Sequence, residues 1–145
     1  MPAPDAFYDA LRAGARSTTS QVRSPDCEAA FRRAHDAGKS AILVTISSGL
    51  SASHDTALIA RERFLQESPD ARIHIVDSLS VSAGQGLLVM EMARMLADGA
   101  SADTVVAWAE DNRLRVNAVF TVDSYEYLVR GGRVSPVVAS AGSVL

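Results

Sequence analysis

The sequence predicts an α/β fold in which helices wrap a parallel sheet. Short apolar runs rich in β-branched residues alternate along the chain with longer segments whose apolar side chains recur at helical spacing. Parallel neighbours in a sheet need crossover connections, and the intervening helices supply them. Because a length of 145 residues suits one ordinary domain, residues 1–145 are expected to form a single α/β domain.

Three segments are expected to be strands, and each ends in polar residues. The first is the apolar run from Ala41 to Ile46, the second covers residues 72–78, and the third covers residues 116–122. Ligands of such folds bind outside the carboxyl ends of the strands. A binding site is therefore expected at one edge of the sheet, among the polar pairs at the three strand ends: Ser47 and Ser48, Asp77 and Ser78, and Asp123 and Ser124.

Helices are expected where apolar periodicity coincides with start and stop signals. Ser24 is predicted to be an N-cap with Pro25 at the first helical position, and Ser101 is predicted to cap a later helix. Gly131-Gly132 is expected to need a positive φ, and residues 134–145 show no clear period. The predicted helices cover residues 5–13, 24–37, 56–66, 81–97, 101–113 and 125–129.

The rest of the chain is organised around the stretch from Ser40 to Thr56. Its buried strand runs into a turn with four serines and a glycine, from Ser47 to Ser53, and a helix follows. The N–H groups of a first helical turn, the positive end of the helix dipole and the hydroxyl groups all favour a bound anion. The pattern predicts that this turn holds the acidic head of a ligand, and it suits a carboxylate or a phosphate.

Composition and charge exclude several classes of function. Fourteen basic against seventeen acidic side chains give a net charge of −3 without a block of like charge, which argues against nucleic acid and membrane surfaces as partners. Cys27 is alone, so an intrachain disulfide and a cysteine-based metal cluster are excluded. No metal site is expected, because His35, His54 and His74 are scattered. Neither a signal peptide nor a membrane-spanning run is found, so the expected compartment is the cytoplasm.

Four blocks of the sequence resemble one known family. They are Thr19-Ser20-Gln21 with Ser24-Pro25, Ile46-Ser-Ser-Gly-Leu-Ser51, Val76-Asp77-Ser78 with Ser82-Ala-Gly-Gln-Gly86, and Phe120-Thr-Val-Asp123 with Tyr127-Leu-Val-Arg-Gly-Gly-Arg-Val-Ser135. In this order they resemble the DegV family of bacterial fatty-acid-binding proteins. The resemblance implies a three-layer parallel-sheet domain of DegV type, incomplete at both ends. The chain would then be a fragment covering the middle of a two-domain protein.

The resemblance also implies what the protein does. It would enclose a long-chain fatty acid, catalyse nothing itself, and need no cofactor or metal besides that ligand. Its partner would be a fatty acid kinase, which phosphorylates the bound carboxylate to an acyl phosphate while this protein presents it. Carried over residue by residue, the carboxylate is held by Thr19, Ser47 and Ser48. The further pocket or loop residues would be Ser20, Asp77, Ser78, Gly131 and Arg133.

The sequence departs from the family pattern in two loops. Val22-Arg23 stands where the family's first loop has a proline, and Ala52-Ser53-His54-Asp55 stands where the family usually has Gly-Thr-Tyr-Gln. A family histidine that helps to hold the carboxylate has no counterpart, because His54 is not at the matching position. These departures fall on the loops that would hold the head group.

Two other functions compete with fatty acid binding. A phosphosugar- or nucleotide-binding α/β domain, including an isomerase, would use the same serine-rich turn for a phosphate. That alternative leaves the Tyr-Leu-x-x-Gly-Gly-Arg block unexplained. A serine hydrolase would need Ser47 or Ser48 together with His54, but the sequence has no Gly-x-Ser-x-Gly elbow.

Overall fold

A computed structural model of the chain describes residues 3–119, 121–122 and 124–142. The chain divides into two compact units. The larger unit covers Gln21–Thr121, and the smaller one combines Met1–Ser20 with Val122–Leu145. Each unit is described by itself. In the described parts of the chain, no helix combines the length and the apolarity needed to cross a membrane.

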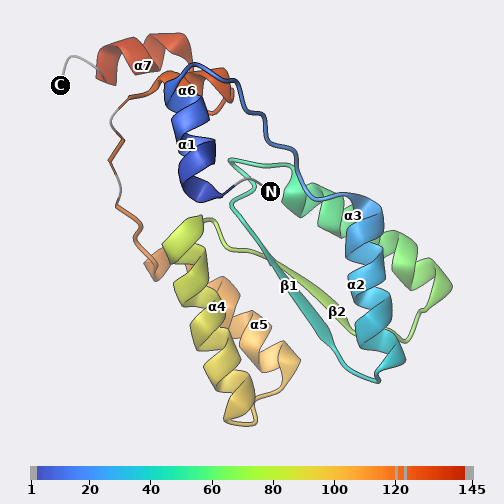
Figure 1. Cartoon of the computed structure of the whole chain (residues 1–145). Coiled ribbons are helices and arrows are strands. Elements are labelled where there is room, and N and C mark those ends of the chain that lie inside the picture. The colour runs from blue at the N-terminus through green and yellow to red at the C-terminus, as the bar shows by residue number, and fades with distance from the viewer. Residues whose placement is uncertain (1–2, 120, 123, 143–145) are drawn as a thin grey trace. The chain divides into compact units, whose positions relative to one another are not determined.

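The larger unit alternates helices with strands, as the sequence predicts, and its described residues contain two of the three predicted strands (Figure 1). The two strands lie side by side and parallel, with Ala41 paired to Ile73 at one end and Thr45 paired to Asp77 at the other. A helix connects them, as a parallel pair requires. The elements in order are α2 (Ser24–Asp36), β1 (Ala41–Thr45), α3 (Ser53–Glu67), β2 (Ile73–Asp77), α4 (Ser82–Ala97), α5 (Ala102–Asn112) and the 3₁₀ turn η1 (Arg113–Arg115).

Helices α2 and α3 cover one face of the sheet. Successive side chains of a strand point to opposite faces, so Leu43, Ile73 and Ile75 all face this layer. Phe31 of α2 and Phe64 of α3 are each 1% exposed, and their ring centroids lie 6.2 Å apart. The remaining buried residues of this cluster are Cys27, Ala57 and Ala60.

Helices α4 and α5 cover the other face (Figure 1). Ile42, Val44 and Val76 alternate with the residues of the first face and point into this second layer. The helices contribute four buried residues to the cluster: Leu88, Met92, Val105 and Ala109. The larger unit is therefore a three-layer sandwich, helix–sheet–helix, and the predicted fold class is confirmed.

The predicted third strand, residues 116–122, is wrong within the described part of the chain. Residues 116–119 and 121–122 form no strand, and Val119 is 96% exposed. Its β-branched residues give the segment strand propensity, but a strand also needs a hydrogen-bonded neighbour. In the described residues the sheet pairs only β1 with β2. Phe120 and Asp123 lie outside the described residues.

Two predicted helix starts are also corrected. Ser24 lies inside α2 and is not its N-cap, because its hydroxyl donates to Glu28 over 2.8 Å and Arg23 occupies the cap position. Helix α3 begins at Ser53, ahead of the predicted Thr56. By contrast, the prediction for Ser101 is confirmed, since its hydroxyl accepts a hydrogen bond from the Thr104 N–H over 3.1 Å.

The smaller unit contains three helices in its described residues: α1 (Pro4–Arg12), α6 (Glu126–Arg130) and α7 (Pro136–Gly142). Helix α6 confirms the predicted helical turn. Helix α7 lies where the sequence shows no period. Gly132 has a φ of +73°, as expected for the glycine pair, whereas Gly131 is in the ordinary helical region.

Candidate functional site

The candidate site is the turn between β1 and α3. Ser47 and Ser48 follow the carboxyl end of β1, and Asp77 and Ser78 close the adjacent strand β2. Because the register pairs Thr45 with Asp77, these four residues share one edge of the sheet. Their predicted meeting is confirmed. Ser48 is exposed, Ser47 is half-buried, and Asp77 and Ser78 are buried beneath them.

The main-chain N–H groups of this turn are used inside the chain. Ser47 donates to the carbonyl of Ser80 over 2.8 Å, Ser48 donates to the Asp77 carboxylate, and Gly49 donates to the Ser47 hydroxyl over 3.2 Å. The sequence alone predicts that main-chain N–H groups at this turn are free to bind the ligand. The N–H groups of Ser47, Ser48 and Gly49 do not fit that prediction. At the surface the turn presents three exposed residues, Ser48, Gly49 and Leu50.

Asp77 is the anchor of the turn. Its Oδ1 accepts hydrogen bonds from the N–H of Ser48 over 3.2 Å and from the N–H of Leu79 over 3.0 Å. Burial raises the pKa of Asp77, but hydrogen bonds from Ser48 and Leu79 and the nearby His54 outweigh that effect, so the pKa lies below its ordinary value. Asp77 is therefore an ionised carboxylate that is only 7% exposed.

Ser78 and Ser80 fix the neighbouring loop after β2. The Ser78 hydroxyl, 1% exposed, donates to the Ser80 carbonyl over 3.1 Å and accepts from the Ser80 N–H over 3.2 Å. The Ser80 carbonyl also accepts a hydrogen bond from the Ser47 N–H, so the loop after β2 is hydrogen-bonded to the turn after β1. Leu79 has a φ of +49° and Ser82 has a φ of +50°. This left-handed conformation is unfavourable for most residues other than glycine, asparagine and aspartate.

His54 lies on the first turn of α3 and faces Thr45. The Thr45 hydroxyl and the His54 Nδ1 are 3.3 Å apart. Among the described residues, no hydrogen bond joins His54 to Ser47 or Ser48. The serine hydrolase hypothesis therefore lacks the nucleophile–base pair that it requires. No pattern in the sequence points to Thr45, which belongs to an apolar run and is buried at the end of β1.

Four of the predicted residues belong to the smaller unit: Thr19, Ser20, Gly131 and Arg133. All four are exposed. That these residues form one binding site with the turn of the larger unit stays a prediction. Gln21, the first residue of the larger unit, donates its side-chain N–H to the Thr56 hydroxyl of α3 over 3.1 Å.

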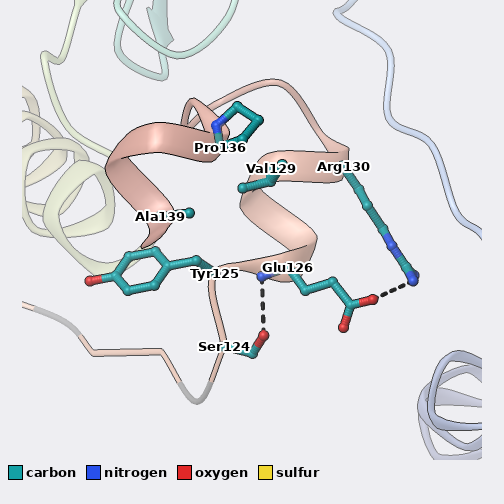
Figure 2. A pocket seen from close by; sticks show the side chains of 7 residues that line it. All are labelled: Ser124, Tyr125, Glu126, Val129, Arg130, Pro136 and Ala139. Carbon is teal, nitrogen blue, oxygen red and sulfur yellow. Dashed lines mark hydrogen bonds and ion pairs between the residues drawn. The ribbon is translucent and has the colours of Figure 1, made fainter. Parts of the chain in front are cut away.

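The smaller unit has a hollow of its own, between α6 and α7 (Figure 2). Its volume is about 300 Å³. The side chains of Arg130 and Glu126 extend toward each other and form an ion pair, so the charge of this guanidinium is compensated (Figure 2). The N–H of Glu126 also donates to the Ser124 hydroxyl over 3.1 Å. The lining residues are Ser124, Tyr125, Glu126, Val129, Arg130, Pro136 and Ala139.

Neither metal chemistry nor thiol chemistry has support in the described residues. There, no group of three or more His, Cys, Asp or Glu side chains converges as a metal site would require. Cys27 of α2 is 3% exposed and lies in the core cluster with Phe31 and Phe64. Burial raises the pKa of its thiol, which makes the thiolate scarce.

Comparison with known proteins relates the chain to one family. The family model described as "Uncharacterised protein, DegV family" matches residues 2–145. A DegV domain-containing protein of Clostridium perfringens is 44% identical over 142 residues, which cover 98% of this chain and 49% of that protein. The chain thus spans about half the length of the curated relatives it matches.

Solved structures share the fold. A stearic-acid-binding protein from Eubacterium ventriosum is 28% identical, with a TM-score of 0.80 over 97% of this chain and 48% of its own. The Fatty Acid Kinase (Fak) B3 protein of Streptococcus pneumoniae, loaded with linoleic acid, is 27% identical, with a TM-score of 0.79 over 94% of this chain and 47% of its own. The first is described as a protein that binds a fatty acid, and the second holds one.

Proposed function

Since the chain belongs to the DegV family, we propose that it contributes the head-group half of a fatty-acid-binding protein. In this proposal residues 1–145 form the central part of a two-domain DegV protein. The carboxylate of a long-chain fatty acid lies at the turn between β1 and α3. The observation that carries the proposal is the gathering of Ser47, Ser48, Asp77 and Ser78 at one edge of a three-layer fold, because proteins with a similar fold bind fatty acids.

The proposed contacts to the carboxylate come from hydroxyl groups. Ser47 and Ser48 lie at the turn, and Thr19 belongs to the loop that leads into Gln21, whose side chain is hydrogen-bonded to α3. A helix end stabilises an anion by only about 0.3–2 kcal/mol. Each buried methylene contributes about 0.8 kcal/mol, so a long acyl chain contributes on the order of 10 kcal/mol before the costs of binding. In this proposal the hydroxyls orient the fatty acid and the acyl chain supplies the affinity.

The protein would act as a presenting subunit and not as an enzyme. A fatty acid kinase would phosphorylate the carboxylate that the turn holds at the surface, in the cytoplasm where ATP is at hand. The support is the likeness to the Fak B3 protein and the exposure of Ser48, which keeps the head group within reach of a partner.

The experiment is lipid extraction from the purified protein followed by mass spectrometry. Bound fatty acid is expected in the unaltered chain and strongly reduced in the double variant Thr19→Ala, Ser48→Ala. Ser101→Ala is the matched control, because it removes a hydroxyl that caps α5, a helix that contains no predicted site residue. That variant should lose about 1 kcal/mol of stability and keep its lipid. Unchanged occupancy in the double variant would refute the assignment of these hydroxyls.

The phosphate-binding alternative is tested on the same protein. A phosphosugar or nucleotide site would raise the melting temperature with sugar phosphates and leave it unchanged with fatty acids. The reverse result is expected.

A further inference from the structure

The loops of the candidate site contain no cation of their own. The turn after β1 covers residues 46–52 and the loop after β2 covers residues 78–81, and neither segment carries a charged side chain. The carboxylate of Asp77, which closes β2, brings a negative charge to this edge and accepts the Ser48 N–H over 3.2 Å. A fatty acid carboxylate at the turn would add a second negative charge. Like charges at close range disfavour each other, so a cation from another element is expected to serve the site.

Arg113 brings a positive charge to this edge of the sheet. It is the first residue of η1, the 3₁₀ turn that follows α5. Its Nη1 donates to the main-chain carbonyl of Asp77 over 3.0 Å. The Ser48 N–H also ends its hydrogen bond on Asp77, at the side-chain oxygen Oδ1. Arg113 and the serine turn are therefore joined through one residue, at the carboxyl end of β2 where ligands of this fold class bind.

The charge of Arg113 has no counter-ion within the described part of the chain. There, Arg113 forms no ion pair, and its hydrogen bond goes to a neutral main-chain carbonyl. Other arginines of the described residues do pair with carboxylates, namely Arg12, Arg23, Arg32, Arg94 and Arg130. Arg113 is nevertheless half-buried. A guanidinium carries five N–H donors and stays charged at neutral pH, so a bound anion is the partner that suits it.

His54 is the other basic side chain beside the turn. Its Nδ1 lies 3.3 Å from the Thr45 hydroxyl, so this ring is engaged with β1. An imidazole is a cation only when it is protonated, whereas a guanidinium is always one. Arg113 therefore matches the permanent negative charge of a fatty acid carboxylate at neutral pH better than His54 does.

On the premise of the proposed function, we infer that Arg113 is a specificity-determining residue of the head-group site: its guanidinium supplies the counter-charge of the fatty acid carboxylate held at the serine turn. The hydroxyls of Ser47 and Ser48 orient the head group, and Arg113 makes the site select an acid over an uncharged lipid with the same alkyl chain. The planar guanidinium suits this role, because it can donate two parallel hydrogen bonds to one carboxylate.

The test compares two probes that share one alkyl chain, decanoate and decan-1-ol, by isothermal titration calorimetry at pH 7. The unaltered chain should bind decanoate more tightly. In Arg113→Gln this preference should fall about 10- to 100-fold, because a hydrogen bond to a charged group is lost. Arg113→Lys keeps the charge without the planar donor group, so its preference should be intermediate. A circular dichroism spectrum and a urea midpoint establish that each variant is folded.

Two other arginines provide matched controls. Arg61 is half-buried like Arg113, and its Nε donates to the main-chain carbonyl of Ile73 over 2.7 Å, at the opposite end of β2. Arg115 is exposed in the same 3₁₀ turn, and its Nη1 donates to the Asn112 side-chain oxygen over 3.2 Å. Arg61→Gln and Arg115→Gln each remove one positive charge, as Arg113→Gln does. Both should leave the preference for decanoate unchanged.

The outcomes separate this inference from the proposed function. If decanoate binds and its preference over decan-1-ol survives in Arg113→Gln, or falls equally in Arg115→Gln, Arg113 does not meet the head group and the inference is wrong. It is also wrong if Arg113→Lys loses as much of the preference as Arg113→Gln does. If decanoate fails to bind the unaltered chain, the proposed function fails and the inference falls with it.

Discussion

Two glycines in the first turns of α4 provide a matched pair for testing how the loop after β2 packs. A Cβ added at Gly84 would lie 2.1 Å from the Ser80 hydroxyl oxygen and 3.4 Å from both the Ser80 Cβ and the Ala118 Cβ. A Cβ added at Gly86 would meet no atom within 4 Å. The two positions lie in one helix, so their intrinsic preference for alanine is similar and the packing differs.

The expected magnitudes follow from these distances. Replacing glycine by alanine inside a helix stabilises by about 1 kcal/mol, and Gly86→Ala should show this gain. Overpacking a filled site costs about 1–3 kcal/mol, so Gly84→Ala should be neutral or destabilising by up to about 2 kcal/mol. Ser80→Ala removes the clashing oxygen and leaves contacts of 3.4 Å. In that background Gly84→Ala should recover most of the helical gain.

The assay is urea unfolding of the unaltered chain, the two single variants at Gly84 and Ser80, and their double variant, with Gly86→Ala as the control. The coupling energy of the cycle should be about 1–3 kcal/mol in favour of the double variant. If Gly84→Ala alone stabilises as much as Gly86→Ala does, then the Ser80 side chain turns away without cost. The close packing of this loop against α4 would then be refuted.

Three further predictions concern the core and Asp77. Phe64→Ala should destabilise by about 3–5 kcal/mol in urea unfolding, because it empties a fully buried site, whereas Ile59→Ala on the exposed side of the same helix should cost less than about 1 kcal/mol. Cys27 should react with a thiol reagent only as the chain unfolds, measured as alkylation against urea concentration, because it is buried and its pKa is raised. The stabilisation from ionised Asp77 should be complete above the ordinary aspartate value of 3.8 and be lost as the pH falls through its lowered pKa, so acid should lower the urea midpoint more in the unaltered chain than in Asp77→Asn.

Most of the larger unit could be predicted from the sequence. The alternation of Ile42 and Val44 with Leu43, and the same alternation in β2, reflects a sheet covered on both faces. The helices follow from apolar spacing and from local signals such as the Ser101 cap. The shared edge of Ser48 and Asp77 follows from the rule that parallel strands bring their carboxyl ends together.

What could not be predicted depends on contacts between distant residues. Residues 116–122 have strand propensity, but propensity does not say whether a neighbouring strand accepts their hydrogen bonds. Ser24 has the sequence pattern of an N-cap, but in the structure its hydroxyl donates a hydrogen bond to the Glu28 carboxylate. The engagement of the turn by Asp77 joins residues 29 positions apart, and no local pattern in the sequence expresses it.

Under the proposed function, the orientation of the head group and the affinity for the ligand are carried by different parts of the protein. The turn, its anchor Asp77 and the supporting Ser78–Ser80 loop all lie in the larger unit and are joined by hydrogen bonds within it. In that proposal they would act on a head group through a few kcal/mol, whereas the acyl chain would bring on the order of 10 kcal/mol before costs. The surface that buries the acyl chain can therefore change along the rest of a DegV protein while the chemistry of the turn stays fixed. Under the proposed function, variation in acyl-chain preference among relatives should thus map outside the turn.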